Sequence, residues 1–198
     1  QDLMKINRDI EDGSFFKNER LIKAMEHAKT NNSALHLMGL LSDGGVHSHI
    51  NHLFALIDMA NSFGLKKVYI HAFLDGRDTS IDSGIGFIKR LKEKIAPLGY
   101  KIASLSGRVY AMDREQRYDR LQKAYDVLVN GANLIEQDAE KVLNDSYGKG
   151  IYDEFVEPTL LCKDGVIGDN DSVIFYNFRS DRAREITFAL TDKDFKHF

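Results

Sequence analysis

The sequence of 198 residues contains one cysteine and two prolines, and it has no long apolar run. The single cysteine, Cys162, excludes an internal disulfide and is typical of a reducing compartment, so we expect a cytoplasmic protein. No apolar run approaches the roughly 20 residues of a membrane-spanning helix, and the first residues do not resemble a signal peptide. Because no Ser/Pro-rich linker divides the chain, we expect a single domain.

The chain also lacks a strong charge of either sign. Its formal net charge is −3, which gives no basic field to hold a nucleic acid or an anionic membrane, and neither partner is expected. Apolar residues make up 43% of the sequence and aromatic residues 10%, enough for a sizeable core. The sequence begins with Gln1 rather than Met, which favours a processed product or an excised piece of a longer chain.

Four apolar runs predict buried strands, at 35–41, 68–74, 100–105 and 172–178. Helical patterns occur at about 18–28, 50–63, 81–95, 113–128, 138–147 and 183–190. Residues 1–17 are weakly patterned, and a short β-excursion is expected between Phe155 and Lys163. Strands that alternate with helices predict an α/β fold of three layers, α/β/α, with a mostly parallel central sheet.

Each predicted strand stops at a polar cluster. In chain order, the clusters supply Asp43 and His47, then Asp75, Arg77 and Asp78, then Arg108, and finally Arg179. Arg114 and Arg182 follow a helical turn or so later. Ligands of mostly parallel sheets bind outside the carboxyl ends of the strands, so we expect these side chains to assemble one site.

Arginines are the most frequent residues among these clusters. A guanidinium presents a rigid fork of donors that matches carboxylate and phosphate oxygens two at a time. Five guanidiniums in one cleft would repel one another unless anions fill it. A small ligand with both phosphate and carboxylate groups therefore fits this site better than a neutral sugar. Any one of these arginines alone is better explained as a surface residue or the partner of an acidic side chain.

The acidic residues and the histidine have more than one possible role. Asp78 is a candidate general base or acid towards a bound hydroxyl, and it is also a candidate cap for a helix near Ile81. Asp43 and Asp75 each precede a glycine and are candidates for shaping turns only. His47 suits hydrogen bonding to a phosphate oxygen, proton transfer or a purely structural role.

The same clusters permit a metal site. Residues of acceptable ligand type are Asp43, His47, His49, Asp75 and Asp78. Five nearby arginines argue against that reading, because they raise the cost of binding a divalent cation. No nucleophile elbow, P-loop or G-x-G-x-x-G fingerprint is present. The other histidines have no motif around them, so we expect core or surface roles for them.

Four separated motifs carry a resemblance to a known family. They are Ser42-Asp43-Gly44-Gly45-Val46-His47-Ser48-His49, His71 to Thr79 with Asp75-Gly76-Arg77-Asp78, Gly107-Arg108 through Ala111-Met112-Asp113-Arg114, and Asn177-Phe178-Arg179-Ser180-Asp181-Arg182-Ala183-Arg184. Together they closely resemble the 2,3-bisphosphoglycerate-independent phosphoglycerate mutases. Each motif alone is weak, but the four occur in order across residues 39–184.

The resemblance implies a domain organisation. In that family a metal-binding phosphatase-like domain is made from both ends of the chain, and a substrate-binding (phosphotransferase) domain is inserted between them. Residues 1–198 resemble the inserted domain alone, with remnants of the hinge linkers at about 1–10 and 190–198. The family's serine nucleophile motif and its manganese-binding segments are absent from the sequence. The resemblance therefore implies no cofactor in this chain and two Mn²⁺ ions in the other domain.

The resemblance also implies a substrate and the residues that hold it. Phosphoglycerate, as the 3- or 2-isomer, is expected to contact His47, Arg77, Asp78, Arg108, Arg114, Arg179 and Arg182, with Asp78 moving the hydroxyl proton. In the full-length enzyme of that family, a serine of the phosphatase-like domain, which belongs to the same longer chain, takes the phosphate from one glycerate oxygen. It then returns the phosphate to the other glycerate oxygen. Two alternatives remain open: a free-standing binding domain for a small phosphorylated acid, and a self-contained metal hydrolase that uses the Asp and His residues.

Overall fold

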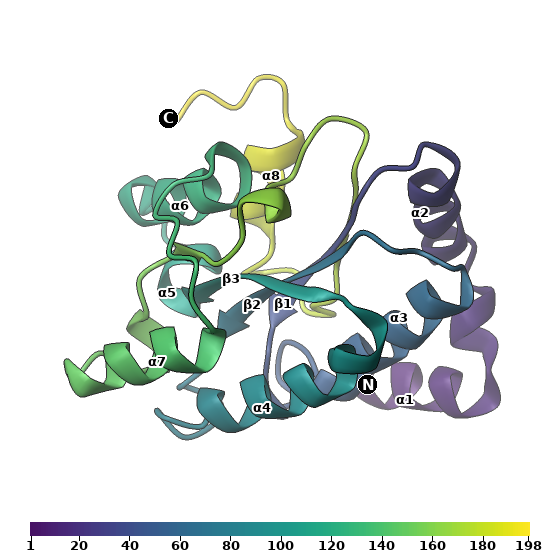
Figure 1. Cartoon of the computed structure of the whole chain (residues 1–198), viewed down its shortest axis with the longest axis horizontal. Coiled ribbons are helices and arrows are strands. Elements are labelled where there is room, and N and C mark those ends of the chain that lie inside the picture. Colours follow the sequence, from purple (N-terminus) through teal and green to yellow (C-terminus); the bar gives the residue numbers. More distant parts are fainter.

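A five-stranded sheet lies at the centre of the computed structural model, which describes all 198 residues, and helices cover both of its faces (Figure 1). The strand order is β4-β3-β2-β1-β5. Four strands pair in parallel: β1 (Leu35–Leu40), β2 (Val68–Leu74), β3 (Lys101–Gly107) and β5 (Ser172–Phe175). The short β4 (Thr159–Leu160) pairs with β3 in the antiparallel direction. The predicted three-layer α/β/α fold with a mostly parallel sheet is confirmed.

The larger part of the core lies on one face of the sheet. The helices α2 (Glu19–Thr30), α3 (Ile50–Ser62), α4 (Gly84–Ile95) and α7 (Ala139–Gly148) contribute apolar side chains to it. Leu35 and Leu37 of β1 and Ile70 of β2 belong to the same cluster of 28 buried residues. These strand residues alternate along the chain, as the two-residue period of a strand requires.

A smaller cluster of 10 buried residues covers the opposite face. Met38, Leu40 and Phe73 of the sheet meet apolar residues of α5 (Arg108–Ala111), α6 (Tyr118–Tyr125) and α8 (Arg184–Thr191) there. In Figure 1, α5, α6 and α8 lie together on the side of the sheet away from α4. This layer matters for function because three of the expected arginines belong to it or lie next to it. Arg108 begins α5, Arg114 lies between α5 and α6, and Arg182 precedes α8.

A buried chain of hydrogen bonds crosses the sheet on this second face. Asp171 Oδ2 accepts from His36 Nε2 (2.8 Å), His36 Nδ1 lies 2.9 Å from His71 Nε2, and His71 Nδ1 lies 2.7 Å from the Ser104 hydroxyl. Burial lowers the pKa of both histidines, so both are neutral at pH 7. The core role expected for His36 and His71 is confirmed.

Local signals at several helix ends behave as expected. The Asn18 side chain caps α2 by accepting from the backbone N–H groups of Arg20 and Leu21. Gly64, predicted to end the helix after 50–63, has a φ of 72° directly after α3. Asp138 caps α7, where a short helix was predicted. The boundaries of β2 match the predicted strand, and β1 ends one residue earlier than predicted.

The N-terminal segment contains structure that its pattern did not predict. Residues 1–17 form the helix α1 (Asp2–Asp12) and a 3-10 turn (Ser14–Lys17). No residue of α1 is buried, but Leu3, Ile6 and Ile10 recur at helical spacing and are half-buried along one face. The helix is tied to the domain by Asn7, whose Oδ1 accepts from His52 Nε2 at 2.7 Å. The hinge-linker assignment of about 1–10 and 190–198 stays a prediction.

Two predicted helices begin later than their patterns indicated. The loop after β2 continues through Ser83, and α4 begins at Gly84. Ile81 therefore lies in the loop, where its side chain is 56% exposed. Asp78 therefore does not cap a helix at Ile81. The helix predicted from Asp113 begins only at Tyr118 and continues in a π-helical turn (Asp126–Asn130).

The region between α7 and β5 is mostly irregular. The predicted β-excursion reduces to the two residues of β4, flanked by 3-10 turns at Asp153–Phe155 and Lys163–Gly165. A further 3-10 turn, Ala96–Leu98, follows α4.

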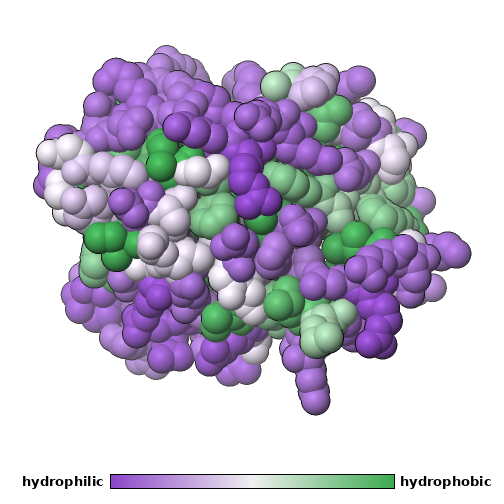
Figure 2. All heavy atoms as spheres, turned by 90° about the horizontal axis from the view of Figure 1, so that it is seen from below, coloured by the Kyte–Doolittle hydropathy of each residue, from purple (hydrophilic) through white to green (hydrophobic).

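The outer surface follows from the amphipathic helices. The face seen from below is mostly hydrophilic, with smaller apolar areas among the polar side chains (Figure 2). No helix combines the length and the apolar character needed to cross a lipid bilayer.

Candidate functional site at the carboxyl edge of the sheet

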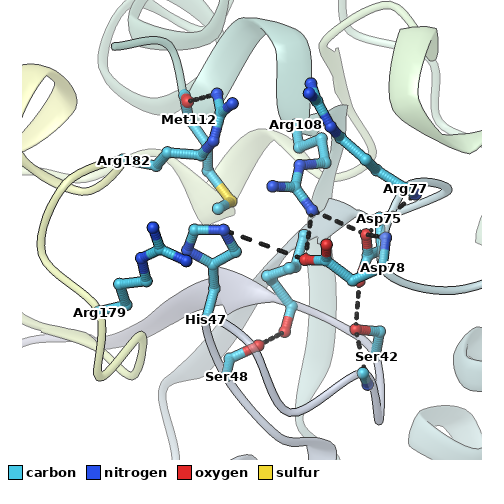
Figure 3. Close-up of polar contacts among 12 residues, drawn as sticks. Ser42, His47, Ser48, Asp75, Arg77, Asp78, Arg108, Met112, Arg179 and Arg182 are labelled. Carbon is cyan, nitrogen blue, oxygen red and sulfur yellow. Dashed lines mark hydrogen bonds and ion pairs between the residues drawn. The ribbon is translucent and has the colours of Figure 1, made fainter.

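The carboxyl ends of β1, β2, β3 and β5 bring the predicted site residues to one edge of the sheet, and Figure 3 shows all of them except Arg114. His47 follows β1, Arg77 and Asp78 follow β2, Arg108 begins α5 directly after β3, Arg114 lies between α5 and α6, and Arg179 and Arg182 lie between β5 and α8. In Figure 3, Arg179 and Arg182 lie on one side of His47, and Arg108 with Asp75 and Asp78 on the other. The side chains of distant segments thus face a common space.

Asp75 is the buried centre of the β2 loop. Its Oδ1 accepts from the backbone N–H groups of Arg77 (3.1 Å) and Asp78 (2.9 Å) and from Arg108 Nη1 (2.8 Å). Its Oδ2 accepts from the Ser42 hydroxyl at 2.6 Å. Four donors satisfy this buried carboxylate, as burial of a charge requires. Asp75 therefore shapes its turn, as expected, and it also fixes the Arg108 side chain.

Asp78 and His47 face each other beside Arg108. Arg108 Nη1 donates to Asp78 Oδ2 at 2.8 Å, and the same oxygen lies 4.0 Å from His47 Nε2. Burial lowers the pKa of His47, the Arg108 charge lowers it further, and Asp78 and Asp181 oppose this shift only in part. His47 is therefore neutral at pH 7, so one ring nitrogen donates and the other accepts.

Asp181 is a site residue that the sequence reasoning missed. Its Oδ1 lies 3.0 Å from Arg179 Nε and 3.9 Å from His47 Nδ1, and its Oδ2 accepts from Arg114 Nη1 at 2.9 Å. One carboxylate thus holds two of the expected arginines and faces the histidine. The available signal was its place between Arg179 and Arg182, because a carboxylate inside an arginine-rich segment is a ready partner for them.

Arg77 and Arg182 have looser partners. Arg77 is 57% exposed, and its Nη1 lies 3.7 Å from Glu154 Oε1. Arg182 Nη1 donates to the Met112 carbonyl at 3.3 Å, and no carboxylate lies within 4.0 Å of its guanidinium. Burial and then the charges of Arg114, Arg108 and Arg77 lower the pKa of Arg182, which shows how closely the guanidiniums approach.

A cavity of about 300 Å³ lies among these arginines. It is lined by Arg77, Arg108, Val109, Asp113, Glu115, Arg120, Glu154, Phe155 and Arg182. Arg120 and Glu154 were not identified from the sequence. Three larger cavities, of about 460, 510 and 600 Å³, lie elsewhere and are lined by none of the seven predicted site residues.

The charges of the site are largely balanced within the chain. Five guanidiniums face four carboxylates, those of Asp75, Asp78, Glu154 and Asp181, and the cavity is also lined by Asp113, Glu115 and Arg120. The expectation that five arginines need external anions is therefore only partly right. An incoming anion must compete with these carboxylates, and Arg182 is the guanidinium that has none.

The segment 153–157 packs directly beneath the site loops, a contribution that the sequence did not indicate. A Cβ on Gly107 would lie 2.3 Å from the Glu154 carbonyl oxygen, and one on Gly76 would lie 2.9 Å from Asp153 Cβ. Only glycine permits these approaches. Asp153 is fully buried and accepts from the Gly84 N–H at 2.7 Å and from the Tyr147 hydroxyl, and burial raises its pKa to about 6. The segment 153–157 thus packs against the loop that carries Arg77 and Asp78 and holds it in place.

The residues considered as metal ligands do not assemble a metal site. No group of three or more His, Cys, Asp or Glu side chains is placed to hold a metal ion. Asp75 and Asp78 bind Arg108, and the His49 ring caps α3 by accepting from the Asn51 N–H at 3.1 Å. The metal-hydrolase alternative therefore has no ligand set in this chain.

Comparison with known proteins identifies relatives of the whole chain. The protein family described as BPG-independent PGAM N-terminus (iPGM_N) matches residues 6–198. Proteins named 2,3-bisphosphoglycerate-independent phosphoglycerate mutase are 54% identical in Lachnoclostridium phytofermentans, 52% in Clostridium novyi and 49% in Listeria monocytogenes, each over 203 aligned residues. All of this chain is covered, but it spans about 40% of the length of these relatives.

A solved structure gives the same result for the fold. A Leishmania mexicana phosphoglycerate mutase, crystallised at low cobalt concentration, superimposes with a TM-score of 0.94 at 30% identity. The match covers 100% of this chain and 39% of that one. The resemblance inferred from the four motifs is confirmed. The chain belongs to the family of BPG-independent phosphoglycerate mutase N-terminal domains.

Proposed function

We propose that this domain binds the substrate of a cofactor-independent phosphoglycerate mutase, an isomerase that interconverts 3-phosphoglycerate and 2-phosphoglycerate. The observation that carries the proposal is the gathering of five arginines around His47 and Asp78 at the carboxyl edge of the sheet. Phosphoglycerate has a phosphate and a carboxylate, and each can take a guanidinium fork. Family membership supports the same substrate.

The arginines of the site differ in their exposure and in their ion-pair partners, and these differences suggest their roles. Arg108 is held by two carboxylates and is 3% exposed, so it forms a fixed part of the site. Arg77, Arg114 and Arg179 are 45–57% exposed and can turn towards an anion. Arg182 has no carboxylate of its own and is free to pair with the ligand. His47, being neutral, donates to or accepts from a ligand oxygen.

Asp78 is the proposed acid–base group. A serine of a second domain, outside this chain, takes the phosphoryl group from one glycerate oxygen. The glycerate stays here, reorients and accepts the phosphoryl group on its other oxygen, while Asp78 takes the hydroxyl proton. The two Mn²⁺ ions expected for the reaction belong to that second domain. No residue set of this chain fits a metal, so the residues named here would not hold those ions.

The binding role is tested by titrating 3-phosphoglycerate into this chain and its variants. Arg179→Ala and Arg77→Ala should each weaken binding by at least about 30-fold, because each removes a charge-assisted fork. Arg184→Ala is the matched control, since Arg184 is exposed on α8 and lines no part of the site. Unchanged affinity in both site variants would remove the site assignment.

The catalytic role is tested separately, in a longer protein that also carries the serine domain. Asp78→Asn keeps the shape of the side chain and loses the ability to take a proton. Binding should survive while turnover falls by about 100-fold or more. Turnover near that of the parent would mean that another group moves the proton.

A further inference from the structure

The turn between α5 and α6 directs three consecutive backbone N–H groups at two carboxylates. Glu115 N and Arg117 N donate to Asp113 Oδ2 at 3.0 and 2.9 Å, and Gln116 N donates to Glu185 Oε1 at 3.0 Å. Gln116 has a φ of 59°, in the left-handed region that side chains other than glycine adopt at a cost. The carboxylates compensate that cost, and one of them comes from α8.

Three contacts join this turn to the segment that precedes and begins α8. Arg114 Nη1 binds Asp181 Oδ2 at 2.9 Å, Arg182 Nη1 binds the Met112 carbonyl at 3.3 Å, and Gln116 N binds Glu185. The first contact and the bond to Glu185 are both open to solvent. The first should exchange readily with an anion because it occupies a site arginine, whereas Glu185 binds a backbone N–H and no site arginine.

Glu185 lies against the Asp113 carboxyl group. Asp113 is 5% exposed, and Glu185 Oε2 is buried with no hydrogen-bond donor. Burial and the hydrogen bond with Asp113 raise the pKa of Glu185 to about 7, and the Glu115 charge acts in the same direction. Other charged residues of the elements around Glu185 are Arg114, Arg117, Asp119, Arg120, Asp181, Arg182 and Arg184; among them Asp119 is paired with Arg117.

Asp113 and Arg182 also line the cavity that contains Arg108. Movement of the turn away from α8 would separate Arg114 from Arg182.

We propose that Glu185 is a positioning residue: through its hydrogen bond with the Gln116 N–H it holds the Arg114 turn against α8, so that Arg114 and Arg182 bind the ligand together. This inference rests on the proposed binding of phosphoglycerate, but its first test needs no ligand. Above neutral pH the Glu185 carboxyl group loses its proton, and its repulsion by the acidic side chains of Asp113 and Glu115 loosens the turn.

The first test is an NMR titration of the free domain. The amide signal of Gln116 should shift with a midpoint near pH 7 in the parent. In Glu185→Gln the amide oxygen still accepts from Gln116 but the side chain does not ionise, so the signal should not titrate there. An identical titration in both proteins would overturn the role of Glu185 in it.

The second test is the affinity for 3-phosphoglycerate between pH 6 and pH 8.5. Glu185→Ala should weaken binding about tenfold, the cost of one lost hydrogen bond to a carboxyl group, whereas Glu185→Gln should bind as the parent does at pH 6. The parent should then weaken about threefold relative to Glu185→Gln as the pH rises through 7. The ligand's own ionisation cancels in that ratio. Glu19→Ala, an exposed acid in the first turn of α2, is the control for the helix dipole.

Different results would contradict the proposed binding of phosphoglycerate and the positioning role of Glu185. Parent protein that does not bind 3-phosphoglycerate contradicts the proposed function, and the Gln116 titration then still decides whether Glu185 and Asp113 hold the turn. Parent protein that binds, with Glu185→Ala and Glu185→Gln equal to it at every pH, overturns the positioning role.

Discussion

Arg108 and Asp75 form a buried ion pair, with Nη1 and Oδ1 2.8 Å apart and the side chains 3% and 1% exposed. The same guanidinium nitrogen reaches Asp78 at 2.8 Å. Arg108 thus joins the loop after β2 to the start of α5, and it combines a structural role with its place in the site. The other arginines have no comparable burial, so the loss of Arg108 should have different consequences from the loss of Arg114.

Arg108→Ala should destabilise the fold by about 3–5 kcal/mol, because it leaves a buried carboxylate without its counter-charge. Arg114→Ala removes an ion pair that is 45% exposed on the arginine side and should cost less than about 1 kcal/mol. Urea unfolding of the two variants and the parent measures both values. Equal stability of the two variants would show that the Arg108 pair contributes no more than a surface pair.

Gly84→Ala and Gly86→Ala form a matched pair on α4. A Cβ at Gly84 would lie 2.6 Å from Asp153 Oδ1, whereas nothing lies within 4 Å of a Cβ at Gly86. Gly84→Ala should cost about 1–3 kcal/mol through overpacking, and Gly86→Ala should stabilise by about 0.5–1 kcal/mol through helix propensity. Thermal unfolding checks the signs, and two stabilising results would mean that the Asp153 brace yields easily.

Asp181→Asn should raise the affinity for a small anion. The change removes a carboxylate that competes with the ligand for Arg114 and Arg179, and it raises the net positive charge of the site by one. The gain should be about threefold to tenfold and should shrink with added salt, since the site is open to solvent. Titration of inorganic phosphate at two ionic strengths measures it. Weaker binding by the variant would mean that Asp181 pre-orients the arginines more than it competes.

The pH dependence of stability should reflect the buried histidines. Burial, with a smaller effect of His49, lowers the pKa of His52 to about 4. Below the unfolded value of about 6.5 the unfolded chain binds a proton that the folded chain does not, so stability falls as the pH drops from about 6.5 towards 4.

His52→Gln tests this explanation, because its amide can still donate to Asn7 Oδ1 but does not ionise. The loss of stability between pH 7.5 and pH 5 should be about 1–2 kcal/mol smaller in the variant than in the parent. Unfolding curves at both pH values provide the comparison. The same pH slope in both proteins would place the dependence on other groups.

Local signals in the sequence predicted much of the fold. Asn18, Gly64 and Asp138 mark helix ends through interactions within a few residues, so the pattern was sufficient there. The helix α1 was not predicted, although Leu3, Ile6 and Ile10 recur at helical spacing. Ile81 fitted the apolar face of α4 by spacing, yet it lies in a loop that Asp75 and Asp153 hold from outside the helix.

In the site, too, some features follow from the local sequence pattern and others depend on contacts between residues far apart in the sequence. The expected arginines reach one edge because parallel strands align their carboxyl ends, a rule that needs only the strand pattern. The partners of these arginines come from tertiary contacts: Asp181 with Arg114, Glu154 with Arg77 and Glu185 with the Gln116 turn. Residues more than 60 positions apart carry no sequence signal of such a pairing.

The most direct test of the central claim is an amide NMR map of 3-phosphoglycerate binding to this chain. Binding should be weak, with a Kd from high micromolar to millimolar, because exposed ion pairs must offset the entropy of association. The shifts should cluster in residues 42–49, 75–79, 107–117 and 177–185, and added salt should reduce the affinity. No binding at 10 mM ligand by a folded protein, or shifts confined to the cavities away from the carboxyl edge, would contradict the account.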